Sequence, residues 1–359
     1  MLLDTRTNRA AYERMVEVIR SKLSLAFAGA GVPTPLGYPS WPALITRLAE
    51  ETRTAIGGEG ISDASGGELS IAEALSIPDG LVAAAIFRHN LGQRYADIMR
   101  ETFGPREGVV GSIHDLVGLP FTHILTSNYD PSLELAFTQS QLPFCSLCLC
   151  DDAAAGDFLR RLRERIEPRC VLHLHGVWDR PQTIILTEND YAQLYDRATI
   201  TTFWSAVTTL HSCVFFGFSF LDNDLVGQFW NRARRQMRDL NHYAVVRIEK
   251  SESEAAARTF HKEKYGIEPV FFDKLDDRFT GYDDLLRKVV ADVHPTPVRT
   301  FDEPAEGVVE VRPVASPIAP EPDLLHLPNG AEPIFAEDIA ALEGLTASNL
   351  RKRRTGDLE

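Results

Sequence analysis

The sequence has few cysteines, an excess of negative over positive charge, and no long apolar run. Its 359 residues include five cysteines, which are too few and too unevenly spaced for a disulfide scaffold. With 51 acidic and 37 basic residues the formal net charge is −14, which argues against direct, broad nucleic-acid binding, since that needs a cationic field. The most apolar run, 213–221, is far shorter than the ~20 residues that span a bilayer. The charged N-terminal stretch lacks the apolar segment of a signal peptide. We therefore expect a cytoplasmic protein with reduced thiols and no membrane contact.

The residues that are present can build a sizeable core, because 44% of them are hydrophobic. Helical and strand patterns alternate through the first part of the chain, and the strand signals are continuous apolar runs. Such runs are typical of a sheet covered on both faces, and alternating strands and helices favour parallel order. The sequence thus predicts an α/β fold with a doubly wound, mostly parallel Rossmann-like sheet. The predicted strands are 23–28, 121–126, 143–148, 170–174, 182–187, 213–217, 243–248 and 267–272.

The pattern predicts one domain over residues 1–294, followed by an arm over 295–359. Within the domain, 57–118 reads as a helical insertion with no strand of its own. Residues 295–333 hold nine of the 21 prolines, and a short amphipathic stretch follows at 335–350. An extended segment with a short helix could contact a neighbouring subunit or a partner, although plain disorder explains the composition equally well.

The first motif that could take part in ligand binding is Gly29-Ala30-Gly31, at the end of the first predicted strand. Glycines at such a turn let the backbone approach a ligand, and exposed N–H groups can hold phosphate. A plain tight turn after a buried strand would look the same. The third glycine of the dinucleotide fingerprint is absent at the usual offset, which disfavours an ordinary dehydrogenase.

The second motif is Thr126-Ser127-Asn128-Tyr129-Asp130, directly after the strand predicted at 121–126. Ligands of open α/β sheets bind at the carboxyl ends of strands, so this cluster places hydroxyl, amide and carboxylate groups where a ligand would lie. Asp130 could simply cap a helix, since a proline follows it. Capping leaves Asn128 without a purpose.

Two further motifs follow later strands. In His173-Leu174-His175-Gly176 the alternation of a strand predicts that both histidines share one face, with His175 at the end that reaches a cleft. A purely structural histidine is the alternative. In the run that contains Gly217 and Ser219, the glycine permits backbone approach and the serine can donate to a phosphate or ribose. A plain N-capped turn is again the alternative.

Taken together, GAG with GYPSW, TSNYD, HLHG and GFSFLDNDL are more specific than any one of them. In this order they resemble the sirtuin-like NAD-consuming family over about residues 20–292. The resemblance is strongest to the bacterial branch that serves as NAD-depleting effectors in anti-phage defence and lacks the zinc module. It implies a sirtuin-like fold and an NAD+ hydrolase (NADase) that cleaves the nicotinamide–ribose bond in abortive infection.

The resemblance also implies roles for individual residues. Asn128 would hold the nicotinamide ribose and the attacking water, and His175 would be the general base. Asp130 would bind the nicotinamide carboxamide. The other implied contacts to NAD come from Ala30 and Gly31 at the diphosphate, from Gly29 beside them, and from Gly217 and Ser219 on the phosphate and ribose side.

Departures from the deacylase pattern decide between activities. Four of the five cysteines precede His175, so the two CxxC pairs of the deacylase zinc module are missing and we expect no metal. NAD is then the substrate, and a protein deacylase is a weaker alternative, as is a non-catalytic scaffold that senses NAD or ADP-ribose. The resemblance further implies a homo-oligomer and, as possible partners, a hexameric DNA-translocating ATPase (HerA-like) or an Argonaute.

Overall fold

The structure is a computed structural model in which one unit, Met1–Val298, contains all the described residues. Ser219 and the arm predicted at 295–359 lie outside them. No helix in the described part of the chain is long and apolar enough to cross a membrane. The structure describes residues 2–109, 111–218, 220, 241–249, 251–273 and 280–294.

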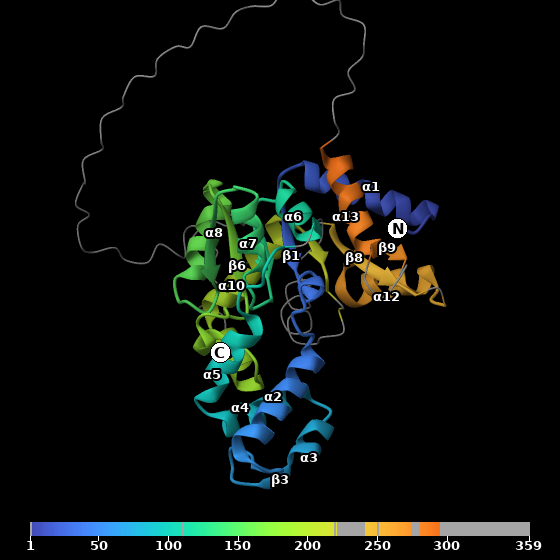
Figure 1. The fold of residues 1–359 in the computed structure, drawn as a ribbon. Coiled ribbons are helices and arrows are strands. Elements are labelled where there is room, and N and C mark those ends of the chain that lie inside the picture. Colours follow the sequence, from blue (N-terminus) through green and yellow to red (C-terminus); the bar gives the residue numbers. More distant parts are fainter. Residues whose placement is uncertain are drawn as a thin grey trace, which may run out of the picture. The chain divides into compact units, whose positions relative to one another are not determined.

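The core of the fold is a seven-stranded sheet in which every neighbouring pair of strands is parallel (Figure 1). The strand order is β5-β6-β4-β1-β7-β8-β9, so the chain places β4, β5 and β6 on one side of β1 and then β7, β8 and β9 on the other. This is the predicted doubly wound α/β fold, with its switch point beside β1. The strands are β1 (Ser24–Ala28), β4 (Ile124–Thr126), β5 (Phe144–Cys148), β6 (Arg169–His173), β7 (Ser212–Phe216), β8 (His242–Ile248) and β9 (Ile267–Asp273).

Helices cover both faces of the sheet, which explains why the central strands are apolar at consecutive positions. All five residues of β1 are buried, and its side chains alternate between two separate clusters. Ala26 and Ala28 pack with α1, α6, α7 and α13, and Leu25 and Phe27 pack with α8, α9 and α10. The bounds are α1 (Arg6–Arg20), α6 (Gly111–Gly118), α7 (Ser132–Gln139), α8 (Ala154–Glu164), α9 (Glu188–Tyr195), α10 (Ala198–Leu210), α12 (Glu254–Tyr265) and α13 (Thr280–Val293).

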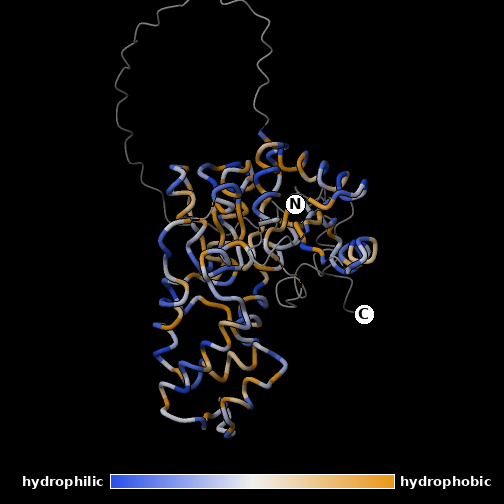
Figure 2. Tube along the Cα trace, turned by 45° about the vertical axis from the view of Figure 1, so that its right-hand side comes forward, coloured by the Kyte–Doolittle hydropathy of each residue, from blue (hydrophilic) through white to orange (hydrophobic). Residues whose placement is uncertain are grey.

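A lobe over residues 38–103, which overlaps the insertion predicted at 57–118, has a core of its own built around Leu48, Phe87 and Met99 (Figure 1), whereas α6 packs in the cluster beside the sheet. Hydrophobic and hydrophilic residues follow each other at short intervals along the lobe (Figure 2), as in helices that bury one face. The prediction of an insertion without strands is wrong, because β2 (Gly60–Ser62) and β3 (Glu68–Ser70) form an antiparallel hairpin. The helices are α2 (Trp41–Ile56), α3 (Ile71–Ser76), α4 (Gly80–Leu91) and α5 (Arg94–Phe103), with a short 3-10 helix η1 (Thr34–Leu36) before them.

The strand predicted at 182–187 is also wrong. Its first residues belong to a 3-10 helix, η2 (Pro181–Thr183), and Thr187 caps α9 through a capping box with Asp190. Ile184 and Leu186 are buried against the insertion lobe rather than in the sheet. The apolar run is therefore explained by core packing of an irregular segment, which looks like a strand in sequence.

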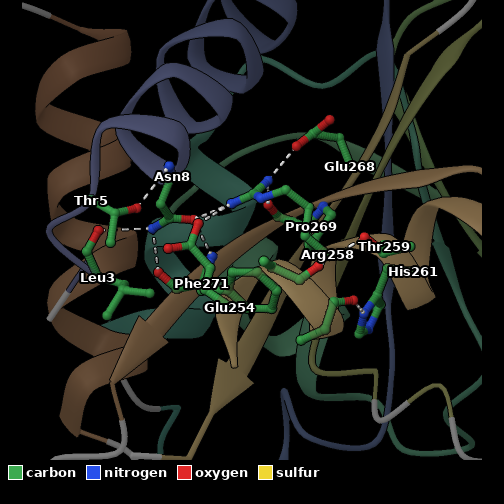
Figure 3. Close-up of polar contacts among 12 residues, drawn as sticks. Leu3, Thr5, Asn8, Glu254, Arg258, Thr259, His261, Glu268, Pro269 and Phe271 are labelled. Carbon is green, nitrogen blue, oxygen red and sulfur yellow. Dashed lines mark hydrogen bonds and ion pairs between the residues drawn. The ribbon is translucent and has the colours of Figure 1, made fainter. Parts of the chain in front are cut away.

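The N-terminal segment closes the outer edge of β9 (Figure 3). The fully buried side chain of Asn8 donates from Nδ2 to the Phe271 carbonyl oxygen at 2.8 Å and accepts the Phe271 N–H at Oδ1, also at 2.8 Å. Leu3 donates its N–H to the same carbonyl at 3.0 Å. Arg258 of α12 donates to Asn8 Oδ1 and pairs with Glu268, so helix, edge strand and N-terminus are joined. The edge backbone groups of Phe271 are thereby satisfied.

Candidate active site

Three turns meet at the carboxyl edge of the sheet, at the ends of β1, β4 and β7. The Asn128 side chain donates from Nδ2 to the Gly29 carbonyl oxygen at 3.0 Å, which joins the second turn to the first. The Gly31 N–H donates to the Gly217 carbonyl oxygen at 2.9 Å, which joins the first to the third. Gly29, Gly31, Asn128 and Gly217 are therefore brought together at the switch point, where doubly wound folds bind ligands.

Close backbone approach explains the glycines of the first and third turns. A Cβ atom on Gly29 would lie 2.8 Å from the Gly217 carbonyl oxygen, and one on Gly217 would lie 2.6 Å from the Val32 nitrogen. Gly217 also has a positive φ of 67°, which side chains disfavour. Only glycine lets the two turns pack in this way.

The backbone N–H groups of the first turn are not equivalent. Those of Gly29 and Gly31 donate to the carbonyl oxygens of Phe216 and Gly217, both at 2.9 Å. Ala30 is exposed, and its N–H has no hydrogen-bond acceptor among the described residues. Of these three residues, Ala30 therefore has the N–H best placed to reach an added anion.

The second turn buries an amide and a carboxyl group. Asn128 is 8% exposed and Asp130 is 3% exposed. Asp130 accepts the Ser132 N–H at 3.0 Å, so it does satisfy a donor in the first turn of α7, as the capping alternative expects. Burial raises the pKa of its carboxyl group, because the charged form is penalised away from water.

His175 lies beyond the end of β6, in the segment that leads towards α9. It is 5% exposed, and its Nε2 atom lies 3.1 Å from the Tyr195 hydroxyl oxygen. The Tyr191 ring packs edge-to-face against it with a centroid distance of 5.2 Å. Burial lowers the pKa of His175 to about 3, so the ring is neutral at physiological pH and stays a weak base while it is buried.

The prediction that the two histidines share one face is wrong, because the strand ends at His173. His173 lies on the α7 side, where Nδ1 is 2.8 Å from the Asn128 carbonyl oxygen and Nε2 is 2.7 Å from Glu134 Oε1. His175 instead contacts α9, which belongs to the other face. Burial disfavours the charged form of His173, but the Glu134 carboxylate outweighs this and raises its pKa to about 9.

Backbone contacts link the His175 segment to the Asn128 turn. The Tyr129 hydroxyl donates to the Ile185 carbonyl oxygen at 2.8 Å, and the Ile185 N–H donates to the His175 carbonyl oxygen at 2.9 Å. The Trp178 N–H donates to the Tyr129 carbonyl oxygen at 2.9 Å. Within the described part of the chain the side chains of Asn128 and His175 share no hydrogen bond, so their relation is set by these contacts.

The sequence did not identify two groups of the site, the Glu134 carboxylate and the tyrosine pair of α9. Glu134 follows Asp130 by one helical turn, a spacing that puts both carboxyl groups near one helix start. Tyr191 and Tyr195 are four residues apart and so share a face of α9. Both signals are visible in the sequence, but neither identifies the histidine that it contacts.

The cysteines do not gather into a metal site in the described residues, where no group of three or more cysteine, histidine or acidic side chains could hold an ion. All five cysteines are free thiols. Cys145 is paired in register with Cys170 across β5 and β6, and Cys150 donates to the Thr183 carbonyl oxygen at 3.0 Å. The expectation that the protein needs no zinc stays a prediction.

Comparison with known proteins agrees with the fold. Residues 122–270 match the SIR2-like domain family, and this range contains Asn128, Asp130, His173, His175 and Gly217. The fold is thus α/β, and this segment of the chain is similar to SIR2-like domains, a family that uses NAD.

The particular similarity is to Defense-associated sirtuin 2 of Bacillus subtilis, which is 24% identical over 236 residues. The aligned part is 64% of this chain and 21% of that protein, so the chain spans about one fifth of the relative's length. The sirtuin-like resemblance and its defence branch, predicted from the four motifs, are confirmed.

Proposed function

We propose that the protein is an NAD+ glycohydrolase that depletes NAD in anti-phage defence. The observation that carries the proposal is the meeting of three kinds of group at one sheet edge. These are an exposed N–H at Ala30, the buried polar groups of Asn128 and Asp130, and the neutral imidazole of His175. Such a set can hold a phosphate, orient an amide-bearing ring and accept a proton.

In the proposed reaction, the bond between ribose C1′ and the nicotinamide nitrogen breaks and leaves an oxocarbenium-like ribose. The bonding electrons go to nicotinamide, which departs as a neutral molecule, so no acid is required. Water adds at C1′ and loses one proton, giving ADP-ribose, nicotinamide and H+. Asn128, whose Nδ2 is held by Gly29, offers Oδ1 to the water or a ribose hydroxyl, and His175 accepts the proton.

Burial of the candidate base suggests how activity is restrained. His175 is covered by Tyr191 and Tyr195 of α9, and α9 is held in turn by the insertion, where Arg88 Nη1 lies 2.7 Å from Asp190 Oδ2. The same carboxylate oxygen accepts the N–H of Thr187 at 3.0 Å. In this proposal, assembly with a partner or a second copy shifts α9 and admits the nicotinamide ribose.

The test is nicotinamide release from NAD by the purified chain, alone and with the product of its genomic neighbour. Asn128→Ala is expected to abolish release while the protein stays folded. Asn90→Ala is the matched control, because Asn90 is an anchoring amide in the insertion that donates to the Ser62 carbonyl oxygen.

The other outcomes separate the alternatives. If neither the chain nor its complex releases nicotinamide, the hydrolase proposal fails. NAD binding without release would then favour the sensing scaffold, and release that depends on an acetylated peptide would favour the deacylase.

A further inference from the structure

We propose that the ion pair of His173 and Glu134 is a positioning device for Asn128, with neither residue touching the substrate. The inference deepens the proposed NAD cleavage and rests on it. It assigns a function to the first histidine of HLHG and to an acidic residue of α7, which are brought together across 39 positions of sequence.

The hydrogen-bond partners fix the protonation of His173 by geometry. The Asn128 carbonyl oxygen can only accept, so Nδ1 must carry a proton. On the other side, Glu134 Oε1 already accepts the Ser146 hydroxyl at 2.9 Å, which is the arrangement of a carboxylate rather than a carboxylic acid. Nε2 therefore donates as well, and the ring is an imidazolium that bridges a carboxylate and a backbone carbonyl.

The cost of burying the His173–Glu134 ion pair argues against a role in stability alone. His173 is 2% exposed and the Glu134 side chain is 16% exposed, so both charges are largely removed from water. Buried ion pairs seldom stabilise a fold more than apolar residues of the same size would. A second oxygen, Glu134 Oε2, is buried without a hydrogen-bond partner among the described residues, which adds to the cost. Such a pair is better explained by the geometry that it imposes.

That geometry concerns both ends of Asn128. Its backbone carbonyl is held by His173, its N–H donates to the Thr126 hydroxyl at 3.1 Å, and its Nδ2 donates to the Gly29 carbonyl oxygen. With these three contacts the residue keeps one conformation, and Oδ1 has a fixed position relative to the glycine turn. Catalytic groups that shift by ~1 Å can lose ~100-fold in rate, so rigidity here has a direct kinetic value.

The two histidines of the motif therefore have different charge states, one charged and one neutral, for different tasks. His173 is a cation that holds a backbone, and His175 is a neutral base. Their environments separate them, because His173 faces Glu134 whereas His175 faces tyrosine rings. Divergent protonation of neighbouring groups is a common sign of divided labour in active sites.

The experiment compares Glu134→Gln and His173→Gln with matched controls, each in the form of the protein, free chain or complex, that cleaves NAD. Glu268→Gln removes the carboxylate of another buried ion pair, at Arg258. His123→Gln removes another buried histidine, which accepts the Cys170 N–H at 3.0 Å at the opposite end of β6. We expect both site variants to lower kcat by ~10–100-fold with KM changed less than about threefold. The controls should lower the melting temperature but keep kcat per folded molecule.

The pH dependence of kcat distinguishes a positioning role from a purely structural one, because a loss of stability alone would not shift it. The groups that face His173 are Glu134 from α7, Asp130 from the turn and Cys148 at the paired position on β5. Because the imidazolium loses its proton near pH 9, kcat of the wild type should fall as pH rises through that value. Glu134→Gln removes the carboxylate that favours the cation, so this limb should move to lower pH by one unit or more.

The outcomes separate this inference from the proposed function. A wild-type assembly that never releases nicotinamide overturns the proposed function and this inference with it. A cleaving wild type whose site variants keep their kcat and alkaline limb overturns the inference alone. Loss of kcat in the controls to the same degree would also refute it, since the effect would then be one of stability.

Discussion

The close packing of Gly217 against the first turn predicts a stability loss that can be separated into two causes. Gly217→Ala puts a methyl group on a residue with φ of 67° and brings it within 2.6 Å of the Val32 nitrogen. The left-handed backbone alone costs about 1–2 kcal/mol for a residue with a side chain. The collision is with backbone atoms, which cannot rotate away, and overpacking of this kind costs a further ~1–3 kcal/mol.

Gly57→Ala is the matched control for this prediction. Gly57 has φ of 66°, and a Cβ atom there would meet no heavy atom within 4 Å. It therefore carries the backbone cost without the collision. Urea denaturation of both variants should give a loss in the free energy of unfolding of about 1–2 kcal/mol for Gly57→Ala and about 2–5 kcal/mol for Gly217→Ala. Equal losses in the two variants would refute the argument that the two turns require glycine for close approach.

Three other predictions follow from buried contacts. Burial lowers the pKa of His123 from 6.5 to about 4, so the folded state binds fewer protons than the unfolded state between these pH values. The free energy of unfolding should therefore be full above pH 6.5 and fall by about 3 kcal/mol as the pH drops through 4. His123→Gln should flatten this slope in urea titrations at several pH values. Asn8→Ala should cost about 2–4 kcal/mol in the same assay, because the Phe271 N–H loses its acceptor in a buried position; a loss below 0.5 kcal/mol would contradict this. Arg88→Ala should raise the rate of nicotinamide release by the free chain about fivefold, because the partly exposed ion pair with Asp190 contributes about 1 kcal/mol to holding α9 over His175. An unchanged rate would argue against restraint of activity by α9.

The sequence was informative where function depends on residues near each other in the chain. Glycines directly after β1 and β7, and Asn128 directly after β4, follow strands that can be recognised from their apolar runs. Parallel order then places the strand ends at one edge, so the meeting of these turns could be predicted.

The contacts of the histidines could not be predicted, because they depend on where a strand stops. Alternation gives both histidines one face only if the strand continues to His175, whereas it ends at His173. For the same reason, 182–187 looked like a strand. Its apolar residues are buried by packing against the insertion, and nothing local distinguishes that from burial in a sheet.

The closure of β9 by the N-terminal segment has a consequence for how copies of the chain can associate. Asn8 supplies through its side chain the donor and the acceptor that an added strand would offer to Phe271, and Leu3 occupies the position beside it. Addition of a strand from another molecule at this part of β9 therefore requires displacement of the N-terminal segment first.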